Sequence, residues 1–144
     1  MYDCLTNRRD FRAFRTISTR WMDNDHYGHV NNAVYYSYFD TAVNSYLIDA
    51  SGTDIRLLPA IGIVAESNCR FLTPLSFPQA VDAGLALEKL GNSSVIYRIG
   101  LFQAGAAEPA ALGRFVHVYV DAKTRHVAPI PPEIRAAVAK LSAP

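Results

Sequence analysis

Residues 31–52 read NNAVYYSYFDTAVNSYLIDASG, and their apolar side chains recur with the period of a helix. Asn31 or Asn32 can cap the helix start, because an asparagine side chain accepts a hydrogen bond from a free N–H of the first turn. Gly52 can end the helix. The pattern therefore predicts a helix from Asn31 to Ala50 with one buried face. That face is made of pairs of residues four positions apart: Val34, Tyr35, Tyr38, Phe39, Ala42, Val43, Tyr46 and Leu47.

The chain changes its period after this helix. Four segments have the composition or alternation of strands and are separated by turn residues: Ile61–Phe71, Val81–Glu88, Val95–Gln103 and Leu112–Asp121. A looser alternation predicts a strand over Phe11–Trp21, and the prolines at 131 and 132 begin a short final helix. A run of strands after one helix indicates an α+β fold, in which the long helix packs on a curved antiparallel sheet of about five strands. The other face of that sheet needs cover, which suggests dimerisation.

Length and composition fit one domain spanning residues 1–144. The chain has 144 residues, with 14 basic and 13 acidic side chains, so its formal charge of +1 argues against general nucleic-acid or membrane binding. No apolar run reaches the roughly 18–20 residues of a membrane helix. The polar segment Met1–Asp10 lacks an apolar signal core, which predicts a cytoplasmic protein. In that compartment Cys4 and Cys69 are expected to be free thiols.

The densest polar cluster precedes the predicted helix, where residues 20–32 read RWMDNDHYGHVNN. Composition alone favours a local role, in which Asp23, Asp25 and the two asparagines satisfy loop and cap hydrogen bonds. A catalytic interpretation is also open. A helix start presents free N–H groups that can hold a developing oxyanion, and a carboxylate just upstream can attack a carbonyl or activate water. That arrangement suits acyl transfer.

Two metal-binding interpretations of the same cluster fit less well. An EF-hand calcium loop needs an oxygen ligand where Tyr27 stands and a glutamate where Val34 stands. A zinc site on His26 and His29 lacks a cysteine or a Glu-x-x-His arrangement. We therefore expect no metal and no cofactor. His117 and His126 show no pairing pattern and are expected to be structural.

A resemblance adds to this interpretation. The cluster and the first half of the helix closely resemble the 4-hydroxybenzoyl-CoA thioesterase family of the hotdog fold, through the motif Arg20-Trp21-x-Asp23-x-Asp25-x-x-Gly28-His29-Val30-Asn31-Asn32-x-x-Tyr35 followed by Tyr38-Phe39-Asp40. The similarity continues through Asn68-Cys69-Arg70-Phe71-Leu72-x-Pro74-Leu75, Gly91-Asn92-Ser93-Ser94, Val118-x-Val120-Asp121 and Pro129-Ile130-Pro131. It covers about residues 10–140. These motifs are specific to the family and not to one substrate.

The resemblance implies a hotdog thioesterase domain that hydrolyses an acyl-CoA thioester to the free acid and CoA. It also implies a homodimer or a dimer of dimers, with active sites at the subunit interface. Two alternatives stay open: a thioesterase acting on acyl-carrier protein, and a noncatalytic acyl-CoA binding protein of the same fold.

The catalytic residues implied by the resemblance are Asp25 and Asn32. Asp25 corresponds to the family's catalytic aspartate and would act as nucleophile or general base. The backbone N–H of Asn32, helped by the backbone near Val30, would polarise the thioester carbonyl. Asp23 is expected either to support the loop or to react, and Gly28 allows a close backbone approach.

Further substrate contacts are expected from residues in several segments. His29 would touch the carbonyl region or brace the loop. Tyr35 would line an acyl pocket, although a helical stripe is more often core. Glu66 would border the partner's active site or simply face solvent. CoA phosphates call for basic groups such as Arg70. The turn at Gly91-Asn92-Ser93 lacks the basic residues that some family members carry there, so Ser93 and Ser94, or the backbone amides of the turn, are expected to contact the phosphates instead. The complete substrate-binding set is Gly28, His29, Val30, Asn31, Tyr35, Glu66, Arg70, Ser93 and Ser94.

Overall fold

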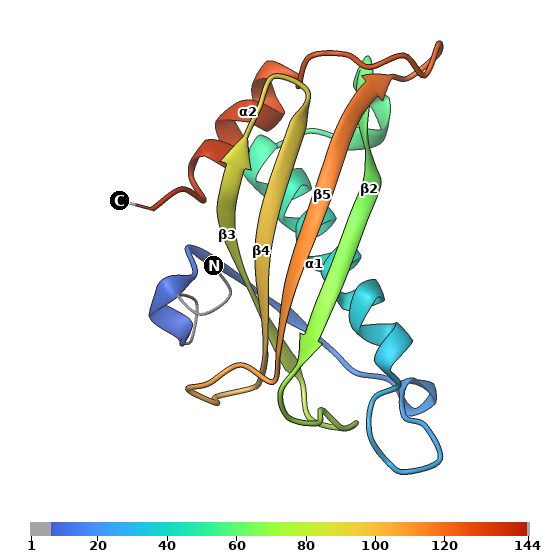
Figure 1. Cartoon of the computed structure of the whole chain (residues 1–144), viewed down its shortest axis with the longest axis vertical. Coiled ribbons are helices and arrows are strands. Elements are labelled where there is room, and N and C mark those ends of the chain that lie inside the picture. Colours follow the sequence, from blue (N-terminus) through green and yellow to red (C-terminus); the bar gives the residue numbers. More distant parts are fainter. Residues whose placement is uncertain (1–6, 144) are drawn as a thin grey trace.

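A curved antiparallel sheet lies against one long helix in the computed structural model, which describes residues 7–143 (Figure 1). Residues 1–6 and 144 lie outside the described part, and with them Cys4 and most of the polar N-terminal segment. The strands are β1 (Ala13–Ile17), β2 (Ala60–Phe71), β3 (Val81–Leu90), β4 (Ser94–Gln103) and β5 (Ala111–Asp121). The helices are α1 (Asn32–Ser51) and α2 (Pro132–Ala139).

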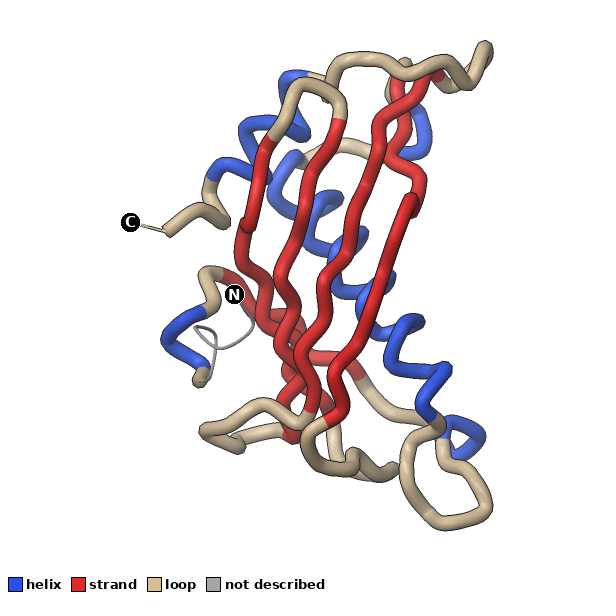
Figure 2. The backbone as a smooth tube through the Cα atoms, viewed as in Figure 1, coloured by secondary structure: helices blue, strands red, loops and turns tan. Residues whose placement is uncertain are grey.

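All neighbouring strands pair antiparallel, in the order β1-β3-β4-β5-β2. The strands form one curved layer, and α1 crosses behind it (Figure 2). β2 stands at one edge and pairs with β5 from Ala60 to Phe71, with a bulge between Val64 and Glu66. Within residues 7–143 no strand covers the outer edge of β2. This edge therefore presents unpaired backbone groups that a further strand can engage.

The predicted helix is confirmed, with its bounds shifted by one residue. The Asn31 side chain accepts a hydrogen bond from the N–H of Ala33 at 3.0 Å, so Asn31 is the cap. Gly52 ends the helix in the left-handed region, at φ 68°. The predicted face is buried apart from the half-buried Val34. At its centre the ring of Phe39 lies so close to Gly113 of β5 that a Cβ there would meet ring atoms at 2.4 Å. Helix and sheet are thus in direct contact.

The N-terminal strand differs from its prediction. Only Ala13–Ile17 pair with β3, and Trp21 lies in a short 3₁₀ turn with 79% of its surface exposed. Phe11 precedes the strand and packs on the outer face of the sheet, in edge contacts with Phe14 and Phe102. The chain therefore covers part of the face that we expected a second protomer to cover.

The remaining elements agree with the expected α+β architecture, and α2 begins at Pro132 as predicted. No helix among residues 7–143 is long and apolar enough to cross a membrane. Cys69 is a free thiol, and its burial raises its pKa to about 12.

His117 of β5 gives the fold a testable pH dependence. The side chain is buried between helix and sheet, and loss of solvation lowers its pKa from 6.5 to about 4. The folded protein thus keeps His117 neutral where the unfolded chain protonates it. The free energy of unfolding therefore keeps its full value above about pH 6.5. It falls as the pH drops towards 4, by up to about 3 kcal/mol in total, because the unfolded chain binds a proton at His117 and the folded chain does not.

The measurement is urea unfolding between pH 7 and pH 4 for the natural chain and His117→Phe. The variant keeps an aromatic ring, a larger one, that cannot titrate, so its stability should fall less between pH 7 and pH 4, whatever its absolute stability. Equal losses in the two proteins would contradict the assignment.

Candidate active site

The loop between residues 20 and 31 is closed by its own backbone. The N–H of Asp25 donates to the carbonyl of His29 at 2.8 Å, beside a bridge between Asn24 and Val30. Gly28, at φ +82°, makes the tight turn between them. The buried Val30 then donates to the carbonyl of Leu75 at 2.8 Å. The loop therefore has a fixed position at the start of α1, as Figure 1 shows near the lower end of the helix.

The buried side chain of Asp23 holds this loop against the first turns of α1. Its side chain is only 1% exposed and accepts hydrogen bonds from the backbone N–H of Arg20 and the hydroxyl of Tyr38, both at 2.8 Å. The guanidinium of Arg20 lies 3.0 Å away. Burial by itself raises the pKa of Asp23, but the hydrogen bonds from Arg20 and Tyr38 and the Arg20 charge outweigh it and leave the pKa below its ordinary value. Asp23 is thus a charged support for the loop.

Asp25 is half-buried in the same loop. Its Oδ1 accepts hydrogen bonds from the N–H of Tyr27 at 2.8 Å and of His29 at 3.4 Å. Within the described part of the chain, Oδ2 has no hydrogen-bond partner. The carboxylate is therefore oriented through one oxygen, while the other remains available to a substrate or to water.

The start of α1, directly after this loop, carries backbone N–H groups that can act as hydrogen-bond donors. Asn32 is the first helical residue, so its N–H has no acceptor within the helix. The next N–H, of Ala33, is already taken by the Asn31 side chain. A helix start also carries partial positive charge. Among the described residues, the Asn32 N–H and the partial positive charge of the helix start are therefore favourable to an oxygen that carries negative charge.

An open hollow of about 660 Å³ joins the Asp25 loop to the helix cap; it is lined by Trp21, Met22, Asn24, Asp25, His26, Gly28 and Asn31. Sequence reasoning missed Trp21, Met22, Asn24 and His26 as lining residues, and it considered His26 only as a zinc ligand. The available signal was a pair of large apolar residues, Trp21 and Met22, inside a polar loop, and both are strongly exposed. Among residues 7–143, no group of three or more His, Cys, Asp or Glu side chains is placed to hold a metal ion.

Two predicted contact residues belong to the core around the loop. Val30 is 4% exposed and Tyr35 is 3% exposed. The Tyr35 hydroxyl accepts a hydrogen bond from the N–H of Leu75 at 3.2 Å, and its ring packs edge-on against Phe71. The side chain of Tyr35 therefore ties α1 to the end of β2.

The other predicted contact residues lie on the sheet, outside the Asp25 loop. Glu66 is on β2, and its carboxylate pairs with Arg114 of β5 at 3.0 Å. Arg70 lies further along β2, with an exposed side chain. Ser93 and Ser94 are at the β3–β4 turn, at the opposite end of the sheet from the Asp25 loop (Figure 1). One protomer therefore does not bring these serines to Asp25.

Comparisons with known proteins identify the family of this chain. Residues 19–138 match the model of the thioesterase-like superfamily. The PA5185 protein from Pseudomonas aeruginosa is 49% identical, with a TM-score of 0.92 over 95% of this chain and 96% of that one. The putative thioesterase PA2801 from Pseudomonas aeruginosa is 28% identical, with a TM-score of 0.78 over 89% and 98% of the two chains.

A thioesterase from Thermus thermophilus, in complex with coenzyme A and Zn, is 29% identical, with a TM-score of 0.76 over 93% and 96% of the two chains. A comparison with curated proteins gives no match. The predicted α+β hotdog fold is confirmed by these structures and by the sheet and helix described above. The match covers most of the sequence, and the chain belongs to the thioesterase-like superfamily.

Proposed function

We propose that this protein hydrolyses acyl-CoA thioesters and that Asp25 is its catalytic carboxylate. The observation that carries the proposal is the hollow shared by Asp25 and the cap of α1, in a chain of the thioesterase-like superfamily. The Thermus relative in complex with coenzyme A supports CoA as the carrier. The resemblance of the 20–40 segment to the 4-hydroxybenzoyl-CoA thioesterase family supports the same reaction.

The mechanism uses two groups on opposite sides of the thioester carbonyl. The N–H of Asn32 donates to the carbonyl oxygen and holds the negative charge that develops there. Oδ2 of Asp25 either attacks the carbonyl carbon or removes a proton from the attacking water. In the first route the tetrahedral adduct of Asp25 expels CoA thiolate and becomes a mixed anhydride, which water then cleaves to the free acid and the Asp25 carboxylate. In the second route water adds to the carbonyl carbon, and CoA thiolate leaves from that adduct. Both routes end in free acid and CoA.

We further propose that two copies pair along the free edges of β2. A twofold axis near Ala65 would place the Ala60 end of one β2 beside the Phe71 end of the other. Glu66 and Arg70 would then face the interface region, and the Ser93–Ser94 turn of one protomer would approach the Asp25 loop of its partner. This arrangement explains how residues at opposite ends of one sheet can belong to one site.

The first prediction tests the role of Asp25. Asp25→Asn keeps the acceptor for the N–H groups of Tyr27 and His29 but removes the anionic oxygen. We expect kcat on an accepted acyl-CoA to fall by about 10²–10⁴-fold, with the folded state retained. Asp49→Asn, on the exposed side of α1, is the control and should keep full activity. Near-normal turnover in Asp25→Asn would refute the assignment.

A second prediction concerns the anchor beneath the loop. Tyr38→Phe deletes one hydrogen-bond donor to the buried Asp23, so we expect a loss of about 1–3 kcal/mol in the free energy of unfolding. Thermal or urea unfolding measures this loss. The control is Tyr36→Phe, which changes a nearby and more exposed tyrosine and should shift stability much less. Equal effects of the two substitutions would contradict the anchoring role.

A third prediction concerns assembly. Ala65→Lys places two like charges near the proposed twofold axis and should convert the assembly to a 15.9 kDa monomer in light scattering, with loss of activity. Val127→Lys, at another exposed site, is the control. A natural chain that is monomeric and fully active would overturn the proposed pairing.

A further inference from the structure

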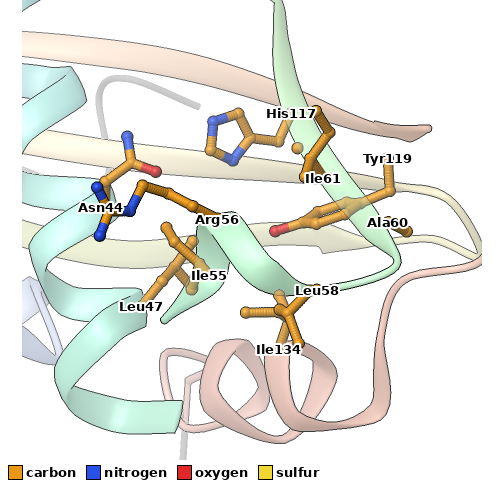
Figure 3. Close-up of a pocket in the computed structure, with 11 residues that line it drawn as sticks. Asn44, Leu47, Ile55, Arg56, Leu58, Ala60, Ile61, His117, Tyr119 and Ile134 are labelled. Carbon is orange, nitrogen blue, oxygen red and sulfur yellow. The ribbon is translucent and has the colours of Figure 1, made fainter. Parts of the chain in front are cut away.

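A cavity of about 270 Å³ lies between the later half of α1 and the first residues of β2 (Figure 3). Leu47 and Ile134, each 1% exposed, close it on the side of the core, and Ile55 and Leu58 extend its aliphatic wall. An apolar cavity of roughly 150 Å³ is known to hold benzene, so this volume corresponds to roughly ten non-hydrogen atoms. The cavity therefore suits the end of a small organic group.

The cavity and the Asp25 hollow of one chain share no lining residue. Asn44 at the cavity follows Asn32 by twelve residues, which corresponds to about 18 Å of helix. The proposed pairing of β2 edges gives the cavity a different neighbour. In that pair, the first residues of one β2 stand beside the Phe71 end of the partner's β2.

The Phe71 end of β2 is the end to which the Asp25 loop is attached. The ring of Phe71 packs edge-on against Tyr35, with 4.9 Å between the ring centres. The Tyr35 hydroxyl accepts a hydrogen bond from the N–H of Leu75, and the carbonyl of Leu75 accepts one from Val30 of the loop. Paired β2 edges therefore bring the Asp25 loop of one protomer to the cavity of the other.

Tyr119 of β5 presents a hydroxyl without a partner to this cavity. Its side chain is 3% exposed, and among residues 7–143 no group makes a hydrogen bond to its oxygen. The hydroxyl of Tyr97 and Nδ1 of His117 also lack partners but are fully enclosed, whereas the hydroxyl of Tyr119 is not. Figure 3 shows it pointing into the cavity, towards Ile55. Since buried polar groups are nearly always paired, this hydroxyl is suited to pair with a bound molecule.

Gly62 of β2 allows the tyrosine ring to reach this position. It lies opposite Tyr119 in the sheet, and a Cβ there would stand 3.0 Å from Cζ of Tyr119 and 3.1 Å from Nδ1 of His117. The two rings thus fill the space over Gly62, and the end of the tyrosine ring lies across β2. Burial raises the pKa of Tyr119, so its hydroxyl stays protonated and can both donate and accept.

The other polar groups of the cavity favour an uncharged occupant. The amide nitrogen of Asn44 donates to the backbone and side-chain oxygens of Asp40 at 2.9 Å and 3.1 Å. Its amide oxygen has no partner among residues 7–143, and Figure 3 shows it turned towards the sheet. Arg56 is the only Lys or Arg among the described lining residues, and it makes hydrogen bonds of 2.9 Å and 2.8 Å to the Asp54 carboxylate. No carboxylate of the described residues lines the cavity.

We propose that this cavity receives the acyl group of the thioester attacked at the partner's Asp25 loop, and that Tyr119 makes it prefer uncharged acyl groups that carry a hydroxyl group. The acyl hydroxyl pairs with that of Tyr119, and the amide oxygen of Asn44 is a further acceptor in the same cavity. Acyl groups of up to roughly ten non-hydrogen atoms fit. The inference rests on the proposed hydrolysis and on the proposed pairing of β2 edges.

The first test uses pairs of substrates that differ by one hydroxyl group: hexanoyl-CoA with 6-hydroxyhexanoyl-CoA, and phenylacetyl-CoA with 4-hydroxyphenylacetyl-CoA. We expect kcat/KM of the natural chain to be about 2- to 10-fold higher for the hydroxylated member of at least one pair, as one hydrogen bond allows. Tyr119→Phe should remove this preference and keep kcat/KM for the other member. Tyr97→Phe, which deletes a hydroxyl outside the lining residues, should leave the preference intact.

The second test asks which protomer supplies the cavity. Leu58→Trp narrows the cavity and Asp25→Asn removes the reacting carboxylate, so each variant alone should lose most activity on these substrates. A mixed dimer keeps one complete site, made of the Asp25 loop of the first variant and the cavity of the second. Purified mixed dimers should therefore regain about half of the natural activity. Leu57→Trp, at an exposed neighbour outside the cavity, is the control and should stay active.

Several results would overturn the inference while the hydrolysis stands. One is equal kcat/KM within both pairs, and another is a preference that survives Tyr119→Phe. An equal loss on both members in Tyr119→Phe would mean that the tyrosine contacts the CoA arm. Inactive mixed dimers would mean that each chain uses its own cavity. Absence of CoA release from every acyl-CoA would instead refute the proposed hydrolysis, and this inference with it.

Discussion

The buried carboxylate of Asp23 must be fully hydrogen-bonded, and meeting this requirement fixes the loop before α1. A charge with 1% exposure is tolerable only with several partners, and Arg20 and Tyr38 supply them. The Tyr38 hydroxyl comes from the helix, whereas Arg20 comes from the segment before the loop. The same aspartate accepts the N–H of Asn31 through its carbonyl at 2.8 Å. These bonds fix the position of the loop relative to the helix cap, and Asp25 lies in this loop.

The sequence predicts those parts of the fold that depend on neighbours along the chain. The helix was predicted within one residue, because its cap at Asn31, its stop at Gly52 and its apolar period are all local signals. The four long strands were also predicted from local signals, namely their composition or alternation and the turn residues between them. The motif also identified the loop that holds Asp25. Asp23 and Asp25 stand two residues apart in one polar segment, yet only the fold shows that Asp23 is buried and Asp25 half-buried.

What the sequence could not predict depends on contacts between distant strands. Phe11 lies on the outer face because Gly84 and Gly100 leave space for its ring, and nothing near residue 11 signals this. The Ser93–Ser94 turn and the Asp25 loop both belong to the set of motifs that resembles one family, but the topology puts them at opposite ends of the sheet. The sequence shows no pairing pattern for His117, and only the fold shows that its side chain is buried close to Gly62 of β2.

The central claim is that the Asp25 loop and the start of α1 form a thioester-hydrolysing site. The most direct measurement is thiol release by the purified natural chain from a panel of aromatic, short-chain and medium-chain acyl-CoA thioesters. We expect saturable release of free CoA from at least one of them. Tight binding of acyl-CoA with no thiol released from any member of the panel would contradict it and would favour a noncatalytic binding protein.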